Sequence, residues 1–172
     1  IEYIRAALEM VTKGFSYESV FRYLRCDMSG LARDQVDMLE NYVLALGIRG
    51  YKKWSEKWVR VYRTMDPEDI QVLNEYREIF VREAEILAQG FSSGKRKVCE
   101  YCYSLYQFIE SCEIQKKLKK QELFFKEKGE KALEKEYAQI YGIVMELLDR
   151  MVEILGEEEI TRTEFVQLLE TG

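Results

Sequence analysis

Residues 130–155 have the sequence EKALEKEYAQIYGIVMELLDRMVEIL, and Gly156 follows them. Apolar side chains recur in this stretch every three or four residues, which is the period of an α-helix that buries one face. Gly156 is expected to end the helix. The stretch predicts a long helix whose inward face carries Leu133, Tyr137, Ile140, Tyr141, Val144, Leu147, Leu148, Met151 and Leu155.

The same periodicity runs through most of the remaining chain. We expect further helices over about 2–13, 16–26, 33–46, 66–89, 95–111 and 113–128, and a last one after residue 161. Thr161-Arg-Thr-Glu164 has the spacing of a capping box, and Asp66-Pro67 is typical of a helix start. No stretch alternates with period two for long enough to predict a strand. The 172 residues therefore predict a single all-α domain over 1–172, an irregular multi-helix fold of about seven to nine helices.

A basic and aromatic segment stands out within this helical pattern. Residues 48–63, called the basic segment below, carry six basic residues, one acid and both tryptophans, whereas the whole chain has a net charge of −5. Cations interleaved with rings are typical of nucleic-acid binding. The rings fall at 51, 54, 58 and 62, which is one face of a helix beginning near Tyr51, and such a stripe is more often core than binding surface. Spacing alone leaves both interpretations open and favours buried rings with cations facing solvent.

A second basic run, at residues 95–97, follows an acidic stretch, and a folded surface can gather the two runs into one patch. Contacts from such side chains to phosphates position DNA without reading its sequence. The predicted DNA-binding residues are Arg49, Lys52, Lys53, Lys57, Arg60, Arg63, Lys95, Arg96 and Lys97.

Four cysteines occur, and two of them, Cys99 and Cys102, form a C-x-x-C on a predicted helix. A structural zinc site needs four ligands, and without any histidine in the chain Cys26 and Cys112 would have to complete the set. Buried free cysteine is the commoner interpretation, so we expect no metal and no cofactor in this chain. Unpaired cysteines and the lack of a signal peptide or a long apolar run predict a cytoplasmic location and no membrane partner.

Catalytic patterns are also missing. Without histidine, neither a Ser-His-Asp nor a Cys-His site can be built. The nearest match to a phosphate-binding loop, Gly90 to Arg96, is one residue too short and has Arg96 where a hydroxyl is needed. We therefore expect no enzymatic activity from this chain, which begins with Ile1 and which we expect to be a fragment of a longer protein.

Several strings resemble the AddB (RexB) family, the B subunits of AddAB-type ATP-dependent helicase–nucleases. They are FSYESVFRYLR at 15–25, ENYVLALGIRG at 40–50 with Lys52-Lys53-Trp54 beyond it, EYAQ at 136–139, LLD at 147–149, VEILG at 152–156 and EFVQLLETG at 164–172. The resemblance covers most of the chain in register and is densest over 15–54 and 136–172.

The resemblance implies an internal helical module like the 2B domain of UvrD/Rep-like helicases, inside a subunit that acts in double-strand break repair. It implies that the motor and the iron–sulfur-stapled nuclease lie elsewhere in the parent, so these cysteines should not be equated with the cluster ligands. Two roles remain open. The module contacts duplex DNA and positions it for the motor, or it is a protein-interaction scaffold that docks to the A subunit or to other domains of its parent.

Overall fold

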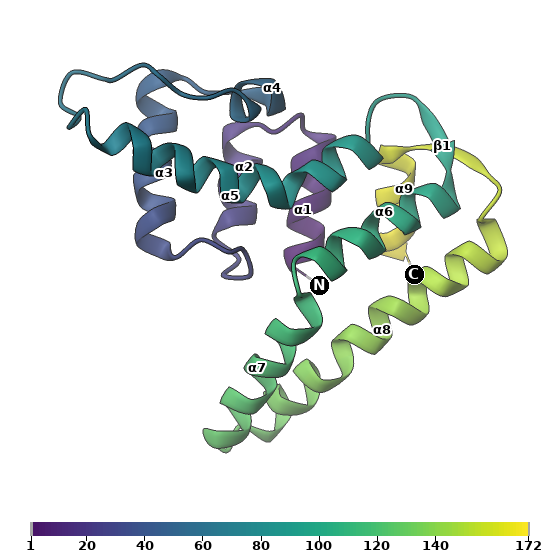
Figure 1. The fold of residues 1–172 in the computed structure, drawn as a ribbon. Helices are drawn as coiled ribbons and strands as arrows, with labels where there is room; N and C mark the ends of the chain where they lie inside the picture. Colours follow the sequence, from purple (N-terminus) through teal and green to yellow (C-terminus); the bar gives the residue numbers. More distant parts are fainter. Residues whose placement is uncertain (1, 172) are drawn as a thin grey trace. The chain divides into compact units, whose positions relative to one another are not determined.

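The computed structural model describes residues 2–171, so the two ends of the predicted domain, Ile1 and Gly172, lie outside the described residues. Within that range the chain forms nine α-helices and one two-stranded sheet (Figure 1). The prediction of an all-α fold with seven to nine helices is therefore confirmed. The described chain divides into two compact units, residues 2–89 and 90–171, called the N-terminal and C-terminal units below.

The N-terminal unit holds five helices. They are α1 (Glu2–Thr12), α2 (Tyr17–Leu24), α3 (Arg33–Leu46), the short α4 (Gly50–Ser55) and the long α5 (Asp69–Gly90), whose last residue already belongs to the C-terminal unit. The bounds of α3 agree with the prediction, and Gly47 closes that helix in the left-handed conformation at φ 65°. The core is lined by large side chains that are almost fully buried, among them Tyr23, Leu39, Tyr42, Trp54, Leu73 and Phe80.

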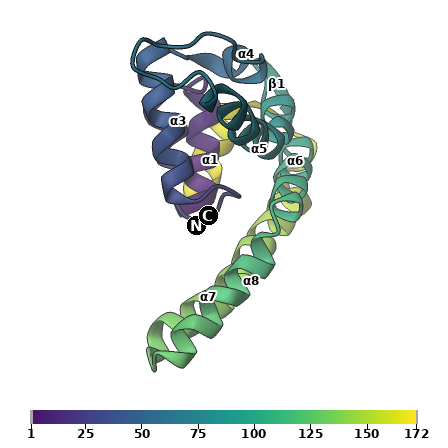
Figure 2. The ribbon, with the colours of Figure 1, turned by 60° about the vertical axis from the view of Figure 1, so that its left-hand side comes forward.

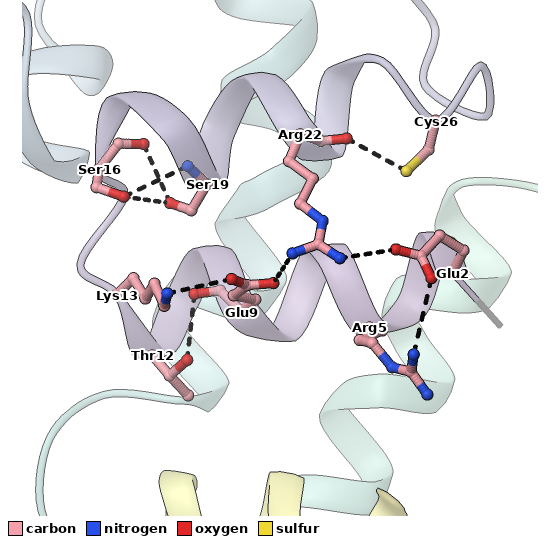
Figure 3. A network of polar contacts seen from close by, with 9 residues as sticks. All are labelled: Glu2, Arg5, Glu9, Thr12, Lys13, Ser16, Ser19, Arg22 and Cys26. Atoms are coloured by element: carbon pink, nitrogen blue, oxygen red, sulfur yellow. Dashed lines mark hydrogen bonds and ion pairs between the residues drawn. The ribbon is translucent and has the colours of Figure 1, made fainter.

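Ion pairs fasten α1 to α2 on the surface of this unit. Figure 3 shows Arg22 of α2 between two acids of α1, donating to Glu2 at 3.0 Å and to Glu9 at 2.8 Å. Ser16 caps α2, as predicted, because its hydroxyl oxygen accepts a hydrogen bond from the backbone N–H of Ser19. These contacts fix the register of the first two helices while their apolar faces pack inward.

The predicted helix through the rings of the basic segment is wrong beyond residue 55. α4 ends at Ser55, and Glu56 is extended, with φ −82° and ψ 144°. Residues 56–66 follow an irregular path before α5 begins at Asp69, two residues after the predicted first helical position, Pro67. The Asp66 carboxylate accepts from the Glu68 N–H at 3.0 Å, as predicted for a cap. The physical reason is tertiary: side chains of α3 and α5 hydrogen-bond the backbone of this segment, so it does not need the helical ladder.

The C-terminal unit holds four helices and the sheet. They are β1 (Lys95–Lys97), α6 (Val98–Ser111), α7 (Ile114–Glu127), α8 (Lys131–Leu155), β2 (Glu159–Thr161) and α9 (Arg162–Thr171). β1 and β2 pair antiparallel, with Arg96 opposite Ile160. The sequence missed both strands, because three residues are too few to show a period of two, and it wrongly extended the helix at Val98 back to Lys95.

The capping box before α9 is confirmed. The backbone N–H of Thr161 donates to the Glu164 carboxylate at 3.0 Å, and the Thr161 hydroxyl oxygen accepts from the Glu164 N–H at 3.2 Å. Phe165, one residue later, is fully buried against Phe91 and Tyr101. The box therefore sets where α9 starts and which face it buries.

α7 and the first half of α8 form an antiparallel hairpin that turns at Gly129, where φ is +74° (Figures 1 and 2). Within the C-terminal unit the hairpin extends away from the sheet and α9 (Figure 2). Within the C-terminal unit α7 packs along this half of α8, and the predicted inward residues from Leu133 to Val144 are half-buried, whereas Leu148 and Met151 nearer α6 are buried. Phe125 and Tyr137 stack between the two helices at 5.4 Å.

Candidate nucleic-acid interface

The two tryptophans of the basic segment are core residues. Trp54 in α4 and Trp58 beyond it are 1% and 5% exposed. Trp54 packs on Phe80 of α5 with ring centroids 4.7 Å apart, and Trp58 stacks on Tyr42 of α3 at 4.8 Å. The packing interpretation is therefore confirmed for both, and it holds without the helix that suggested it.

Two polar residues of α5 hold the backbone around these rings. The amide oxygen of Asn74 accepts from the N–H of Trp58 at 2.9 Å, and its amide nitrogen donates to the carbonyl of Trp58 at 2.8 Å. The guanidinium of Arg77 donates to the carbonyl of Trp54 at 3.0 Å and to Asn74 at 2.9 Å. Arg77 is only 4% exposed, and burial lowers the pKa of its guanidinium from the usual value.

Sequence reasoning missed Asn74 and Arg77, although a signal was present. Arg77 lies four residues after Leu73 and three before Phe80, inside the apolar stripe of α5, and Asn74 lies beside that stripe. A charged residue at an inward helical position is buried only when it is hydrogen-bonded. That rule points to a partner of Arg77 but cannot say that the partner is the backbone of residues 54–58.

All six cations of the basic segment are exposed: Arg49, Lys52, Lys53, Lys57, Arg60 and Arg63. Lys53 approaches Glu56 at 3.9 Å, which is a weak surface pair. Among the described residues the other five have no ion pair. The segment thus presents five uncompensated cations on a backbone that its buried rings and the α5 side chains keep in place.

The second predicted DNA-binding cluster, residues 95–97, differs from the basic segment in its location and in its charge pairing. Lys95, Arg96 and Lys97 form β1 in the C-terminal unit, whereas the basic segment belongs to the N-terminal unit. Lys97 pairs with Glu157 at 2.9 Å, which raises the pKa of its ammonium group, and Arg96 donates to the hydroxyl of Ser92 at 2.6 Å. Of the three, Lys95 alone is exposed, so this run offers less free charge than its sequence suggested.

The four cysteines are free and differ in burial. Cys102 and Cys112 are buried, and Cys26 and Cys99 are half-buried. Burial raises the pKa of the Cys102 thiol to about 12, so this side chain stays protonated near neutral pH. Within residues 2–171 no three Cys, Asp or Glu side chains are arranged to share a metal ion.

The chain is similar over its whole length to proteins named as the B subunit of an ATP-dependent helicase/deoxyribonuclease. It is 39% identical over 175 residues to the protein of Lachnoclostridium phytofermentans, a match that covers 100% of this chain and 15% of that protein. It is 40% identical over 172 residues to the protein of Clostridium novyi, a match that covers 98% of this chain and 14% of that protein. It is 38% identical over 180 residues to the protein of Caldanaerobacter subterraneus subsp. tengcongensis, a match that covers 100% of this chain and 15% of that protein. The chain is homologous to a part of these B subunits.

The chain spans about 15% of the length of the B subunits it matches. The similarity to these B subunits agrees with the resemblance drawn from the strings at 15–25 and 40–50. No protein-family model matches the chain. Across residues 2–171 none of the helices combines the length and the apolar character that crossing a bilayer requires.

Proposed function

We propose that this chain is a non-catalytic helical part of an AddB-type subunit, which contacts duplex DNA during double-strand break repair and positions it for a motor located elsewhere. Its parent would work with an A-type subunit in the cytoplasm, and the chain itself would need no cofactor. The proposal treats the helical architecture as a 2B-like module. It is supported by the names of the relatives, which describe a helicase and deoxyribonuclease.

The observation that carries the proposal is the separation of charge from packing in the basic segment. Five exposed cations without acidic partners among the described residues lie on a backbone anchored by Trp54 and Trp58. Because the segment is already ordered in the free chain, DNA binding would lose little free energy to ordering its backbone. Exposed lysines and arginines on an ordered backbone suit the phosphates of a duplex. Such contacts depend on where the phosphates lie and not on which bases they join.

Fluorescence anisotropy with a labelled duplex tests this. The double variant Lys52→Gln/Lys57→Gln should weaken binding and lower the slope of log affinity against log salt by about two units. The control Arg5→Gln/Lys13→Gln removes two exposed cations of the N-terminal unit and hence the same charge. A chain that ignores duplex DNA at low salt, or equal effects of the two double variants, would refute the proposal.

One observation favours the second role, docking to another protein. Val59 and Val61 of the basic segment are 73% and 43% exposed. Apolar side chains gain nothing from phosphates, whereas they stabilise a protein interface. If docking to an A-type subunit is the role, Val59→Ser/Val61→Ser should abolish co-purification with that subunit and leave duplex binding unchanged. Unchanged co-purification would remove this alternative.

A further inference from the structure

α7 carries a second basic surface that none of the predicted sites includes. Its fourteen residues, IQKKLKKQELFFKE, contain five lysines and two glutamates. The helix turns Ile114 inward, with Leu118 and Phe125 half-buried toward the α8 side of the hairpin. Lys116, Lys119, Lys120, Leu123, Lys126 and Glu127 are exposed, and their spacing of three, four and seven residues puts them on the opposite face. We call these six residues the lysine face.

Local helix energetics disfavour lysines at the start of α7. The first turn contains no acid, and Lys116 and Lys117 stand near the positive end of the helix dipole, which repels cations. Glu113, at the N-cap position, is left-handed with φ 52° and makes no side-chain capping hydrogen bond. The sequence thus places positive charge where the isolated helix would gain from negative charge.

Like charges also face one another along the helix. Lys116 and Lys119 are three residues apart, and Lys116 and Lys120 are four apart, spacings at which equal charges repel. Compensation is partial: Lys119 pairs with Glu122 at 3.1 Å, and Lys116 reaches Glu113 only at 4.0 Å. Lys120 and Lys126 have no acidic oxygen within ion-pair distance among the described residues. An external polyanion would relieve this repulsion.

The shape of the surface decides which polyanion fits. The lysine face lies on the side of α7 that does not pack against α8, in a hairpin that extends from the sheet and α9 (Figure 2), so within the C-terminal unit a wide, stiff ligand can lie along it. Protein interfaces are centred on buried apolar or aromatic anchors, whereas only Leu123 of these six residues is apolar. The neighbouring exposed ring of Phe124 lies 5.5 Å from the ammonium group of Lys128, so its surroundings are also cationic. Lysine ammonium groups spaced along about 15 Å of helix suit instead a duplex, which carries one negative charge per about 1.7 Å of its axis.

We propose that the lysine face of α7 is a second contact surface for the phosphate backbone of duplex nucleic acid. It lies in the C-terminal unit and shares no residue with the basic segment, so it goes beyond the proposed function and can stand or fall without it. Lys120 and Lys126 contribute most, because among the described residues they have no acidic partner to give up on binding. The surface follows the backbone and has no preference for sequence.

The test compares matched double variants of the 172-residue chain by anisotropy with a labelled 20-bp duplex between 50 and 200 mM salt. Lys120→Gln/Lys126→Gln should weaken binding at 50 mM salt at least about tenfold and lower the salt slope by about two units. The control Lys131→Gln/Lys135→Gln removes two exposed lysines from α8 of the same hairpin, which lie among Glu130, Glu134 and Glu136. It should leave the slope within about half a unit.

Circular dichroism of all variants shows whether the hairpin stays helical, and an affinity loss without helix loss supports the surface. Equal effects of the two hairpin variants, or no effect of either, would overturn it. Combining Lys120→Gln/Lys126→Gln with Lys52→Gln/Lys57→Gln separates the two proposals. If only Lys120→Gln/Lys126→Gln weakens binding, the proposed function of the basic segment fails and the lysine face stands. If only Lys52→Gln/Lys57→Gln weakens binding, the lysine face is overturned and the proposed function stands.

Discussion

Arg77 donates a hydrogen bond of 3.0 Å to the carbonyl oxygen of Trp54, so a buried cation from α5 closes the last turn of α4. The same guanidinium carbon lies 5.9 Å from the ring centre of Trp58. A single side chain therefore holds both tryptophans of the basic segment. Stability of the N-terminal unit and presentation of the basic segment depend on the same contact.

Arg77→Met should destabilise the N-terminal unit by about 2–4 kcal/mol. The substitution keeps the length and the apolar stem but leaves the carbonyl of Trp54 buried without its donor. Urea denaturation followed by tryptophan fluorescence measures the change. The control Glu78→Gln removes the exposed acid 3.6 Å from Arg77 and should cost less than about 0.5 kcal/mol. Equal losses in the two variants would contradict the assigned role of Arg77.

Asn74→Ala should loosen the basic segment. It removes both hydrogen bonds to the backbone of Trp58, at an expected cost of about 2–4 kcal/mol. Because Asn74 supplies two of the hydrogen bonds that hold the irregular residues 56–66, trypsin should cut after Lys57, Arg60 and Arg63 faster than in the parent chain. Gln71→Ala, an exposed change one turn earlier in α5, serves as the control. Unchanged cleavage kinetics would show that the rings alone order the segment.

Tryptophan fluorescence should distinguish packing from binding, since Trp54 and Trp58 are the only tryptophans in the chain. We expect a blue-shifted emission that acrylamide quenches poorly, because both rings are buried. Titration with duplex DNA should change the anisotropy of the labelled DNA without quenching this emission, since the phosphates meet the cations and not the rings. Strong quenching by DNA would mean that the rings leave the core to stack on bases.

The stability that the capping box gives to α9 should depend on pH. Hydrogen bonds from Thr161 hold the pKa of the Glu164 carboxyl below its usual value. A carboxyl whose pKa is lower in the folded state stabilises the fold above its unfolded pKa, and this contribution disappears as the pH falls through the folded pKa. Carboxyl NMR titration should therefore show a lowered midpoint for Glu164 in the parent chain.

Thr161→Ala should raise the Glu164 midpoint only in part, because the backbone N–H of residue 161 still donates to the carboxylate. It should cost about 1 kcal/mol, because the N-cap bond to the Glu164 N–H is lost. Thr163→Ala, two residues away and outside the capping bonds, is the matched control. An unchanged Glu164 midpoint in the Thr161 variant would show that the Thr161 hydroxyl contributes nothing and that the backbone N–H of residue 161 and Lys95 hold the pKa down.

Phe165→Ala should be the most damaging single change in α9. The ring is fully buried, with its centroid 5.1 Å from that of Tyr101 and 5.6 Å from that of Phe91. Removing it leaves a cavity, and we expect a loss of about 3–5 kcal/mol in chemical denaturation. Tyr103→Ala in α6 removes a ring that is 63% exposed and should cost less than about 1 kcal/mol. Similar losses would contradict the assignment of Phe165 to the core.

Local chemistry predicted those parts of the fold that depend on near neighbours in sequence. The bounds of α3 and the capping box at Thr161 were predictable, because the interactions that make them are local in sequence. The end of α8 before Gly156 was also predicted, but Gly156 is right-handed there and its carbonyl accepts from the remote Cys99 N–H. The burial of Trp54 and Trp58 was also predictable, since large rings seek a core whatever backbone carries them.

The sequence by itself determined a helical protein with one basic segment, and it favoured buried rings and exposed cations in that segment. Only the tertiary structure decided the path of residues 56–66, because hydrogen bonds from Asn74 and Tyr42, remote in sequence, replace the helical ladder there. It also decided which cations stay free: Lys97 meets Glu157 from far along the chain, whereas Lys52 and Lys57 meet no acid among the described residues. Charge pairing between distant residues is fixed by packing, and for that reason no local pattern could reveal it.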